Sequence, residues 1–570
     1  MRPTANFDHR KYRAPCPVHK PDRRWPDRRI EAAPIWCSVD LRDGNQALVE
    51  PMNPSQKLEL FQLLVDVGFR EIEVGFPAAS RLDFDFVRQL ITDNLIPANV
   101  TIQVLTQARA PVIERTFEAL RGVRRATVHL YNSTSSVQRE VVFHMSKEAV
   151  KSVARRGAEL VRNCARAQPD TSWRFQYSPE SFTDTELDYA VEICDAVTEV
   201  WDPTPQRPVI INLPATVENT TPNVYADRIE WVCDHIARRE ALIISLHTHN
   251  DRGCGVAAAE LGLMAGAERV EGTLLGNGER TGNMDIVTMA MNLYSQGIAP
   301  KLNLENMDRI IDVIARCTQI QLHPRHPYAG ELVFAAFSGS HQDAIRKCMA
   351  RRGDRKLWNV AYLPINPADV GRTYQQVIRI NSQSGKGGVA HVIERARGIV
   401  LPRWFCVDFN PHVQAHAERH GGEVSESAIW SLFERTYLTT RAGMHLGDHS
   451  ICHHEEGPQL RVTLDNEGES IEFEGSGAGL LEAFTRGLSR RFGVDLVILG
   501  EYQQTMERSD PEQIFACVQL SVNGRRCCGA ARHHDSVLAS LESVLSALGR
   551  THTRRARPPT SKQDPLAVRY

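Results

Sequence analysis

Between residues 35 and 297 the sequence alternates eight times between a short apolar segment and a longer segment with helical periodicity. Strands that alternate with helices predict a parallel sheet covered by helices. Eight such units in about 260 residues fit a (β/α)8 barrel, an α/β fold, better than an open doubly wound sheet. No GxGxxG sequence follows the first strand, which argues against a dinucleotide-binding fold. The predicted strands are residues 35–41, 71–77, 99–107, 125–133, 172–180, 208–216, 241–250 and 269–279.

The chain has 570 residues, more than one hydrophobic core usually organises, so we expect several domains. The first thirty residues hold nine lysines and arginines against three aspartates, and we expect this basic arm to wrap its own fold or a neighbouring subunit. After the barrel the pattern becomes mainly helical, and strand–helix units of an α+β regulatory-type domain follow. The last twenty residues lack apolar periodicity and are expected to be disordered. The predicted limits are 1–34 for the arm, 35–300 for the barrel, 301–440 for the helical linker, 441–550 for the α+β domain and 551–570 for the tail.

The charge balance and the cysteines limit which partners the protein can have and in which cellular compartment we expect it. Lysine and arginine total 67 and aspartate and glutamate total 69, a net charge of −2, so we expect no nucleic-acid or membrane partner. No apolar run approaches the roughly 20 residues needed to cross a bilayer, and the N-terminus lacks the apolar core of a signal peptide. Thirteen scattered cysteines without CxxC pairs indicate reduced thiols and a cytoplasmic location.

Polar residues follow the predicted first, seventh and eighth strands, at the barrel face where functional residues gather. His247 and His249 are two residues apart, so both side chains leave the same face of an extended strand. With the strand-one carboxylate Asp43 they could form a facial metal site that leaves positions open for water or a chelating substrate. Asn283 would be a weaker oxygen ligand or lie behind the ligands. The alternative is a polar strand end that binds backbone groups, but the combination favours a metal.

Three further features at these strand ends have two interpretations each. Arg42 should point away from Asp43 if the strand stays regular. It could form a salt bridge with a neighbouring carboxylate, or it could stabilise an oxyanion or a substrate carboxylate, and we favour the second role. Thr216 could bind a carboxylate or cap the next helix. The glycine-rich residues 276–283 could approach a phosphate or an acyl carrier, or form only a tight loop. No P-loop and no Gly-x-Ser-x-Gly sequence occurs, so neither nucleotide hydrolysis nor a serine nucleophile is indicated.

Three separated motifs, SVDLRDGNQAL, SLHTHNDRG and GTLLGNGERTGN, resemble those of the α-isopropylmalate synthases, metal-dependent acyl-CoA condensing enzymes built on a (β/α)8 barrel. Their order along the chain makes the resemblance specific. It is close over about residues 20–440 and looser beyond, and the LRDGNQ form and the length resemble the long bacterial and fungal branch. Further matching segments are YSPE (177–180), NLPATVE (212–218), SGSHQDAI (338–345) and DVGRTYQQVIRINSQSGKGG (369–388).

The resemblance implies a Claisen condensation of acetyl-CoA with 2-oxoisovalerate, followed by thioester hydrolysis to 2-isopropylmalate and CoA. This is the first committed step of leucine biosynthesis. Asp43, His247 and His249 would hold a divalent cation with Asn283 close by, and Mg²⁺ is the expected ion, with Mn²⁺ and Zn²⁺ as alternatives. The keto acid would chelate this ion, and Arg42 would stabilise the oxygen that becomes negative.

The resemblance also assigns the surroundings of the two substrates. Thr216 would fix the keto-acid carboxylate, while His129 and Ser178 would border the branched side chain. Glu279, with the glycines around it, would lie toward acetyl-CoA.

Removing a proton from the acetyl methyl group requires a positioned base. In the family a histidine and a tyrosine from the segment after the barrel supply this chemistry, often in the active site of a partner subunit. They correspond to His341 and, less securely, Tyr374, with Glu180 orienting or polarising His341. From the sequence alone, His341 could equally be a polar residue at the start of a helix.

The C-terminal domain corresponds to the leucine-sensing dimerisation domain of the family, which implies a homodimer with a possible leucine effector. This sequence departs from the family there, with GSGAG at 475–479, LGEYQQTMERSD at 499–510 and an expected glycine-rich loop CCGAARHHD at 527–535. The protein could be insensitive to leucine or bind another effector.

Three alternative functions remain open. A sister condensing enzyme would use pyruvate, 2-oxobutyrate or 2-oxoglutarate, since one methylene changes selectivity by only about 1–3 kcal/mol. A lyase would use similar metal chemistry, but the histidine after the barrel and the long C-terminal domain argue against it. A non-catalytic regulatory paralogue would not need the complete set of catalytic residues.

Overall fold

The computed structural model divides the chain into two compact units. Unit 1 comprises Met1–Val333 and Ile365–Arg372, and unit 2 comprises Phe334–Pro364 and Thr373–Tyr570. The structure describes residues 9–11, 17–336, 338–353, 357–372, 386–420, 424–439, 444–454, 457–466, 468–506 and 513–552.

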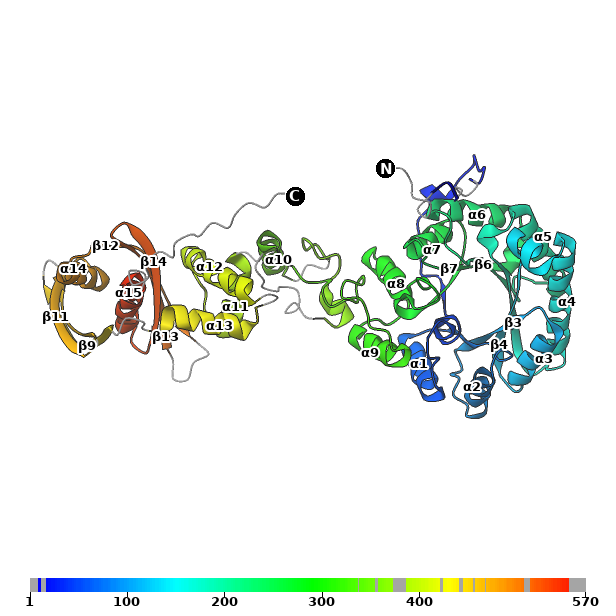
Figure 1. The fold of residues 1–570 in the computed structure, drawn as a ribbon, viewed down its shortest axis with the longest axis horizontal. Helices are drawn as coiled ribbons and strands as arrows, with labels where there is room; N and C mark the ends of the chain where they lie inside the picture. Colours follow the sequence, from blue (N-terminus) through cyan, green and yellow to red (C-terminus); the bar gives the residue numbers. More distant parts are fainter. Residues whose placement is uncertain are drawn as a thin grey trace, which may run out of the picture. The chain divides into compact units, whose positions relative to one another are not determined.

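Unit 1 contains a closed barrel of eight parallel strands in sequential order, in which β1 pairs with both β2 and β8 (Figure 1). The predicted barrel is therefore confirmed. Because every strand is covered by a helix on the outside, most strand residues are buried. The strands are β1 (Ile35–Ser38), β2 (Glu71–Gly75), β3 (Thr101–Gln107), β4 (Arg125–Ser133), β5 (Ser172–Glu180), β6 (Val209–Ala215), β7 (Leu242–Thr248) and β8 (Arg269–Gly272).

The helices of unit 1 begin and end at clear sequence signals. The first one starts at a capping box formed by Asn53 and Gln56, and it stops at Gly68, whose φ of 108° suits glycine. The helices are α1 (Pro54–Val67), α2 (Arg81–Thr92), α3 (Ala110–Ala119), α4 (Lys147–Arg166), α5 (Leu187–Trp201), α6 (Pro222–His235), α7 (Gly255–Met264), α8 (Ile286–Ser295) and α9 (Met307–Thr318).

The first and eighth strands are shorter than the sequence predicts. β1 ends at Ser38, and residues 40–44 form a single π-helical turn, a local irregularity that is frequent at functional sites. β8 ends at Gly272, and Leu275 in the turn that follows has a positive φ of 61°. Because the chain leaves both strands early, the polar residues of these segments lie on turns above the barrel.

The basic arm packs on its own barrel, on the outer face of α6. Lys20 is 4% exposed, and its Nζ lies 2.7 Å from Asp234 Oδ2. Arg23 donates two hydrogen bonds to Asp227, at 2.6 and 2.7 Å, and Trp25 Nε1 donates a third at 2.9 Å. Of the two predicted alternatives for the arm, the structure therefore has the contact with its own fold.

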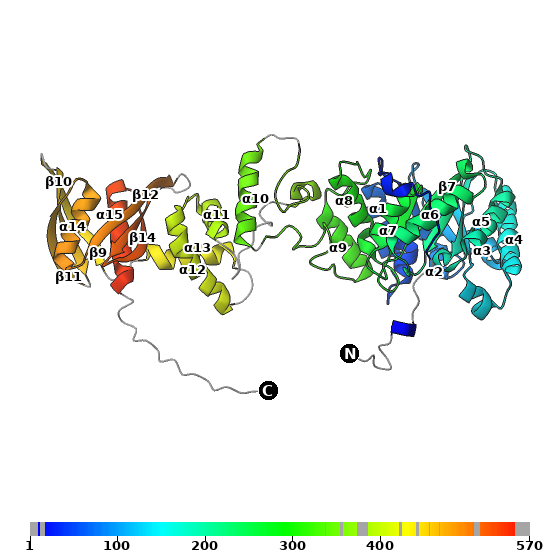
Figure 2. The same cartoon turned by 90° about the horizontal axis from the view of Figure 1, so that it is seen from above.

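Unit 2 begins with helices and continues with two successive three-strand, one-helix repeats. The strand orders are β11-β10-β9 and β12-β13-β14, all antiparallel, and Figure 2 shows α14 and α15 lying along these sheets. This confirms the helical region and the α+β domain of the predicted fold class. The elements are α10 (Gly339–Arg352), α11 (Lys386–Arg397), α12 (Arg403–His420), α13 (Glu426–Phe433), β9 (Met444–His454), β10 (Gly457–Asn466), β11 (Glu469–Ser476), α14 (Leu480–Phe492), β12 (Leu496–Met506), β13 (Gln513–Val522), β14 (Arg525–His533) and α15 (Ser536–His552).

The expected glycine-rich loop at 527–535 is wrong, because residues 525–533 form β14. Its glycine serves close packing: a Cβ on Gly529 would lie 2.2 Å from the Ser543 carbonyl oxygen of α15. The predicted disordered tail lies almost wholly outside the described residues. Among the described residues, no helix combines the length and apolar character needed to cross a membrane.

Candidate active site and metal centre

Three predicted ligands converge at the top of the barrel, from the turn after β1 and from the end of β7. The Nε2 atoms of His247 and His249 lie 3.3 and 3.5 Å from the same oxygen, Oδ2 of Asp43. All three side chains are buried. The edge of an octahedron of ligands about 2.1 Å from a small divalent cation is about 3 Å, so these separations suit one ion.

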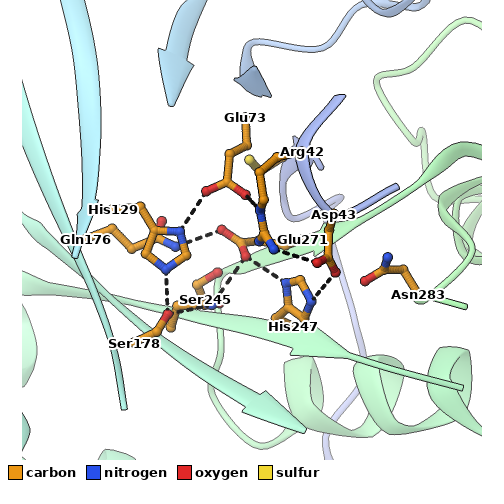
Figure 3. A network of polar contacts seen from close by, with 12 residues as sticks. Arg42, Asp43, Glu73, His129, Gln176, Ser178, Ser245, His247, Glu271 and Asn283 are labelled. Carbon is orange, nitrogen blue, oxygen red and sulfur yellow. Dashed lines mark hydrogen bonds and ion pairs between the residues drawn. The ribbon is translucent and has the colours of Figure 1, made fainter. Parts of the chain in front are cut away.

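Two oxygen atoms beside these imidazoles are buried and have no hydrogen-bond partner among the described residues: Oδ2 of Asp43 and Oδ1 of Asn283. The Asn283 amide nitrogen donates to the carbonyl oxygen of Asn277 at 3.1 Å, and its side chain points toward Asp43 in Figure 3. Buried oxygens without a partner are costly. A cation between them would satisfy both, so this nitrogen and oxygen set fits a divalent ion such as Mg²⁺, Mn²⁺ or Zn²⁺.

The electrostatics of the site favour a bound positive charge. Burial alone would raise the pKa of Asp43, but Arg42 and the two histidines hold it well below the ordinary value. Burial would lower the pKa of His247, yet the carboxylates of Asp43 and Glu271 raise it to about 9. A cation at this position would therefore displace the Nε2 proton of His247.

Arg42 lies on the same side as Asp43, because the condition for the two to diverge, a regular strand, is not met. The strand is not regular there, because the π-helical turn at residues 40–44 follows β1 directly. Arg42 Nη1 lies 2.5 Å from Asp43 Oδ1, and its Nε lies 2.5 Å from Glu73 Oε2 on β2. The ion pair with a neighbouring carboxylate thus exists, and Arg42 also faces the cavity.

A cavity of about 400 Å³ opens above the three ligands. Nine of the predicted site residues line it. Sequence reasoning missed several other lining residues, including Tyr131, Asn212 and Pro214, although a spacing of two along β4 and β6 places them on the same faces as His129 and Thr216. The nine predicted residues are Arg42, Asp43, His129, Ser178, Glu180, Thr216, His247, His249 and Glu279.

One wall of the cavity is a hydrogen-bonded chain of polar side chains (Figure 3). Nδ1 of His129 lies 2.7 Å from Glu73 Oε1, and its Nε2 lies 2.7 Å from Ser178 Oγ. The Asn212 amide donates to the same Ser178 oxygen at 3.0 Å. Fixed partners hold this wall in one arrangement beside the metal-type ligands.

Comparisons with known proteins identify relatives over nearly the whole chain. The 2-isopropylmalate synthase of Alcanivorax borkumensis is 52% identical over 546 residues, covering 96% of this chain and 98% of that protein. The chain belongs to the 2-isopropylmalate synthase family. The synthases of Pseudomonas entomophila and Rhodospirillum rubrum are each 51% identical, covering 95% and 94% of this chain and 97% and 98% of those proteins. The predicted resemblance is thereby confirmed.

Three family descriptions match successive parts of the chain. Residues 33–314 match the HMGL-like family, and residues 331–394 match the alpha-isopropylmalate synthase post-catalytic domain-like family. Residues 423–552 match the LeuA allosteric (dimerisation) domain. The 2-isopropylmalate synthase resemblance therefore extends over the barrel, the helical region and the α+β domain.

The remaining predicted site residues of this member of the 2-isopropylmalate synthase family have defined hydrogen-bond partners. Thr216 Oγ1 accepts a hydrogen bond from the Ser181 amide at 2.9 Å, and Thr221 precedes α6, so Thr216 does not cap that helix. Glu180 accepts a hydrogen bond from Ser133 Oγ. Glu279 Oε1 accepts one from Gln46 Nε2 at 3.0 Å, which fixes it at the cavity edge.

The two candidates after the barrel stay predictions. His341 lies in the first turn of α10, in unit 2, and its ring stacks on Tyr362 with 3.9 Å between centroids. This placement matches the helix-start interpretation and leaves a catalytic role open. Tyr374 lies outside the described residues.

Proposed function

We propose that this protein condenses acetyl-CoA with 2-oxoisovalerate and water to give 2-isopropylmalate and CoA, the first committed step of leucine biosynthesis. One observation carries the proposal: Asp43, His247 and His249 converge beside Arg42 under a cavity of about 400 Å³. The chain is 52% identical to a 2-isopropylmalate synthase over nearly its whole length, which supports the substrate choice.

The keto acid binds above these ligands in the proposed reaction. A divalent ion, Mg²⁺ in our proposal, supplies Lewis-acid polarisation of the keto-acid carbonyl when bound by Asp43, His247 and His249, with Asn283 beside them. Thr216 Oγ1 already accepts from Ser181, which leaves its hydroxyl proton for the keto-acid carboxylate. The branched side chain lies against the apolar lining, which includes Leu105 and Phe76, and against His129 and Ser178.

Arg42 stabilises the charge that develops in the condensation. Burial would lower the pKa of Arg42, but Asp43 and Glu73 raise it, so the guanidinium stays charged. As the acetyl carbon attacks the keto carbon, the carbonyl electron pair moves to oxygen. A fixed cation beside that oxygen stabilises the transition state more than the ground state.

We assign the proton transfer from the acetyl methyl group to His341, with Tyr374 assisting and Glu180 orienting the base. Glu279 and the glycines around it lie toward acetyl-CoA. Water then hydrolyses the thioester and releases CoA. Because residues 423–552 match a dimerisation domain, we propose that the protein forms a homodimer.

The C-terminal domain also supports an effector site. A cavity of about 890 Å³ lies between the starts of α14 and α15 and the strand β12, lined by residues that include Glu482, Tyr502 and Gln503. We propose leucine as its first candidate ligand. The described cysteines, twelve in all, are free thiols, and we propose the reducing cytoplasm as the location.

The decisive assay supplies acetyl-CoA with each of several 2-oxo acids and follows free thiol release, before and after EDTA treatment. We expect 2-oxoisovalerate to be preferred, EDTA to abolish release and Mg²⁺ to restore it. Preference for pyruvate, 2-oxobutyrate or 2-oxoglutarate would identify a sister condensing enzyme. Release that is independent of metal, or absent with every keto acid, would overturn the proposal.

A ligand variant tests the metal centre itself. His247→Ala should reduce thiol release at least about 100-fold, since loss of a ligand removes both the site and its charge balance. His235→Ala, on the exposed end of α6, is the matched control and should retain normal activity. Full activity in the His247 variant would contradict the ligand assignment.

A further inference from the structure

A buried carboxylate that is not a metal-type ligand lies directly behind His247. Glu271 is the third residue of β8 and is fully buried. Its Oε2 lies 2.9 Å from Nδ1 of His247, on the side of the ring opposite to Asp43 (Figure 3). The two carboxylates therefore hold the two nitrogens of one imidazole.

The charge state of Glu271 determines which nitrogen of His247 carries a proton. Glu271 forms an ion pair with the buried guanidinium of Arg269 and accepts hydrogen bonds from three side-chain amides, which are the contacts of an ionised carboxylate. An ionised carboxylate can only accept hydrogen bonds. Nδ1 of His247 therefore donates to Glu271, and the Nε2 lone pair is the one left for a cation.

The rest of the barrel interior keeps Glu271 ionised and in place. Arg269, two residues earlier on the same face of β8, lies 2.8 Å from Glu271 Oε1 and is itself fully buried. Gln176 and Gln103 donate to that oxygen at 2.8 and 3.1 Å, and Asn212 donates to Oε2 at 3.2 Å. Five donors converge on one side chain, which leaves it no freedom to turn away from His247.

The second ligand histidine is held differently. Nδ1 of His249 faces the backbone carbonyl oxygen of Ala215 at 3.2 Å, a neutral and weaker acceptor. A charged acceptor raises the basicity of an imidazole ligand more than a neutral one does. His247 is thus the ligand whose basicity depends on the ion pair between Glu271 and Arg269.

We propose that Glu271 is the positioning residue of the metal centre, which fixes His247 with its proton on Nδ1 and its Nε2 toward the cation, and that Arg269 holds Glu271 for this task. The inference rests on the metal centre of the proposed function. It adds a role for a charged cluster inside the barrel that touches neither substrate. Metal affinity, not contact with substrate, is the property that Glu271 controls.

The experiment measures binding of Mn²⁺ alone to the full chain, by electron paramagnetic resonance of the free ion, with no substrate present. Glu271→Gln keeps the size of the side chain, but its amide can donate to Nδ1 and so place the imidazole proton on Nε2. We expect the affinity to fall about 10–100-fold. At saturating Mn²⁺ the KM for the keto acid should change less than the metal affinity does.

Gln176→Met is the matched control, because it removes a donor to the other oxygen of Glu271 and leaves His247 untouched. The side-chain carbonyl oxygen of Gln176 has no hydrogen-bond partner in the described structure, so replacement by methionine removes only the hydrogen bond to Glu271. We expect its Mn²⁺ affinity to stay within about threefold of the unchanged protein.

A second measurement does not depend on the folding of a variant. Long-range ¹H–¹⁵N spectra of the ¹⁵N-histidine-labelled, Mg²⁺-saturated protein, assigned by difference against His247→Asn, should show His247 protonated at Nδ1. An Nδ1 without a proton would overturn the inference, as would a folded Glu271→Gln variant with unchanged affinity. If the unchanged protein binds no divalent ion, the proposed metal centre itself fails, which is a distinct result.

Discussion

At the scale of single residues, Asp40 combines full burial with a weak set of partners. It accepts hydrogen bonds from Ser38 Oγ at 2.8 Å and from the Leu274 amide, and no described cation pairs with it. Burial raises the pKa of Asp40 to about 7, an effect that these hydrogen bonds oppose and that nearby Asp285 increases. Because the folded chain holds this proton more tightly than the unfolded chain, the stability from Asp40 is lost as the pH rises from about 4 through 7.

Asp40→Asn removes this dependence. The free energy of unfolding of the variant, relative to the unchanged protein, should rise by about 2 kcal/mol between pH 5 and pH 8, since each pKa unit corresponds to about 1.4 kcal/mol. In terms of Tm this is about 4 °C, measured in EDTA at both pH values. Asp170→Asn, which changes an exposed carboxylate, should show no such trend. A difference in Tm that is the same at both pH values would contradict the assignment.

The ligand set could be predicted from the sequence because it needs only short-range geometry. His247 and His249 share a face through a spacing of two, and barrel closure brings β1 beside β8 and close to β7. Glu271 could not be predicted in the same way. Its role depends on Arg269 and on donors from β3, β5 and β6, and a charged residue inside a barrel strand gives no signal of which partner it meets.

At the scale of elements, the basic arm is held by carboxylates of a single helix. Asp227 of α6 is buried and accepts three hydrogen bonds from Arg23 and Trp25. Asp227→Ala should release the arm, and tryptic cleavage after Arg24 should become roughly tenfold faster, because cleavage follows the population of the open form. The cleavage rate is measured on the full chain by mass spectrometry.

The matched control for the arm is Asp188→Ala, an exposed aspartate in the first turn of α5 without a contact to the arm among the described residues. Its cleavage rate should not change. Equal rates in the Asp227 variant and in the unchanged protein would mean that other contacts, such as Lys20 with Asp234, hold the arm alone.

The elements that the sequence pattern predicted are those with clear periodicity. β4 and β5 have the predicted limits, because nine-residue runs end at polar residues and turns. β9 and β14 were not predicted. β9 is largely exposed and rich in histidine, and β14 contains three arginines, a glycine and two alanines, so neither shows the alternation of a half-buried strand.

At the scale of the whole molecule, the helical region and the last sheet share one core within unit 2. Phe433 of α13 is fully buried and contacts the rings of Phe405 and Phe409 from α12, at 5.8 and 5.2 Å between centroids. It also contacts Phe515 of β13 at 6.3 Å. Sequence patterns placed a boundary near residue 440, but they cannot show that aromatic residues on either side of it pack together.

This shared core predicts that α12, α13 and β13 unfold as one cooperative body. Phe433→Ala should remove about 3–5 kcal/mol of opening free energy, the usual cost of deleting a buried phenylalanine side chain. In native-state hydrogen exchange the loss of opening free energy should be the same for peptides from α12 and from β13. Val407→Ala, which truncates a 45% exposed side chain of α12, should change both by less than about 0.5 kcal/mol. Faster exchange in α12 with unchanged exchange in β13 would show that the helical region and the sheet fold separately, and the single shared core would then not govern the stability of unit 2.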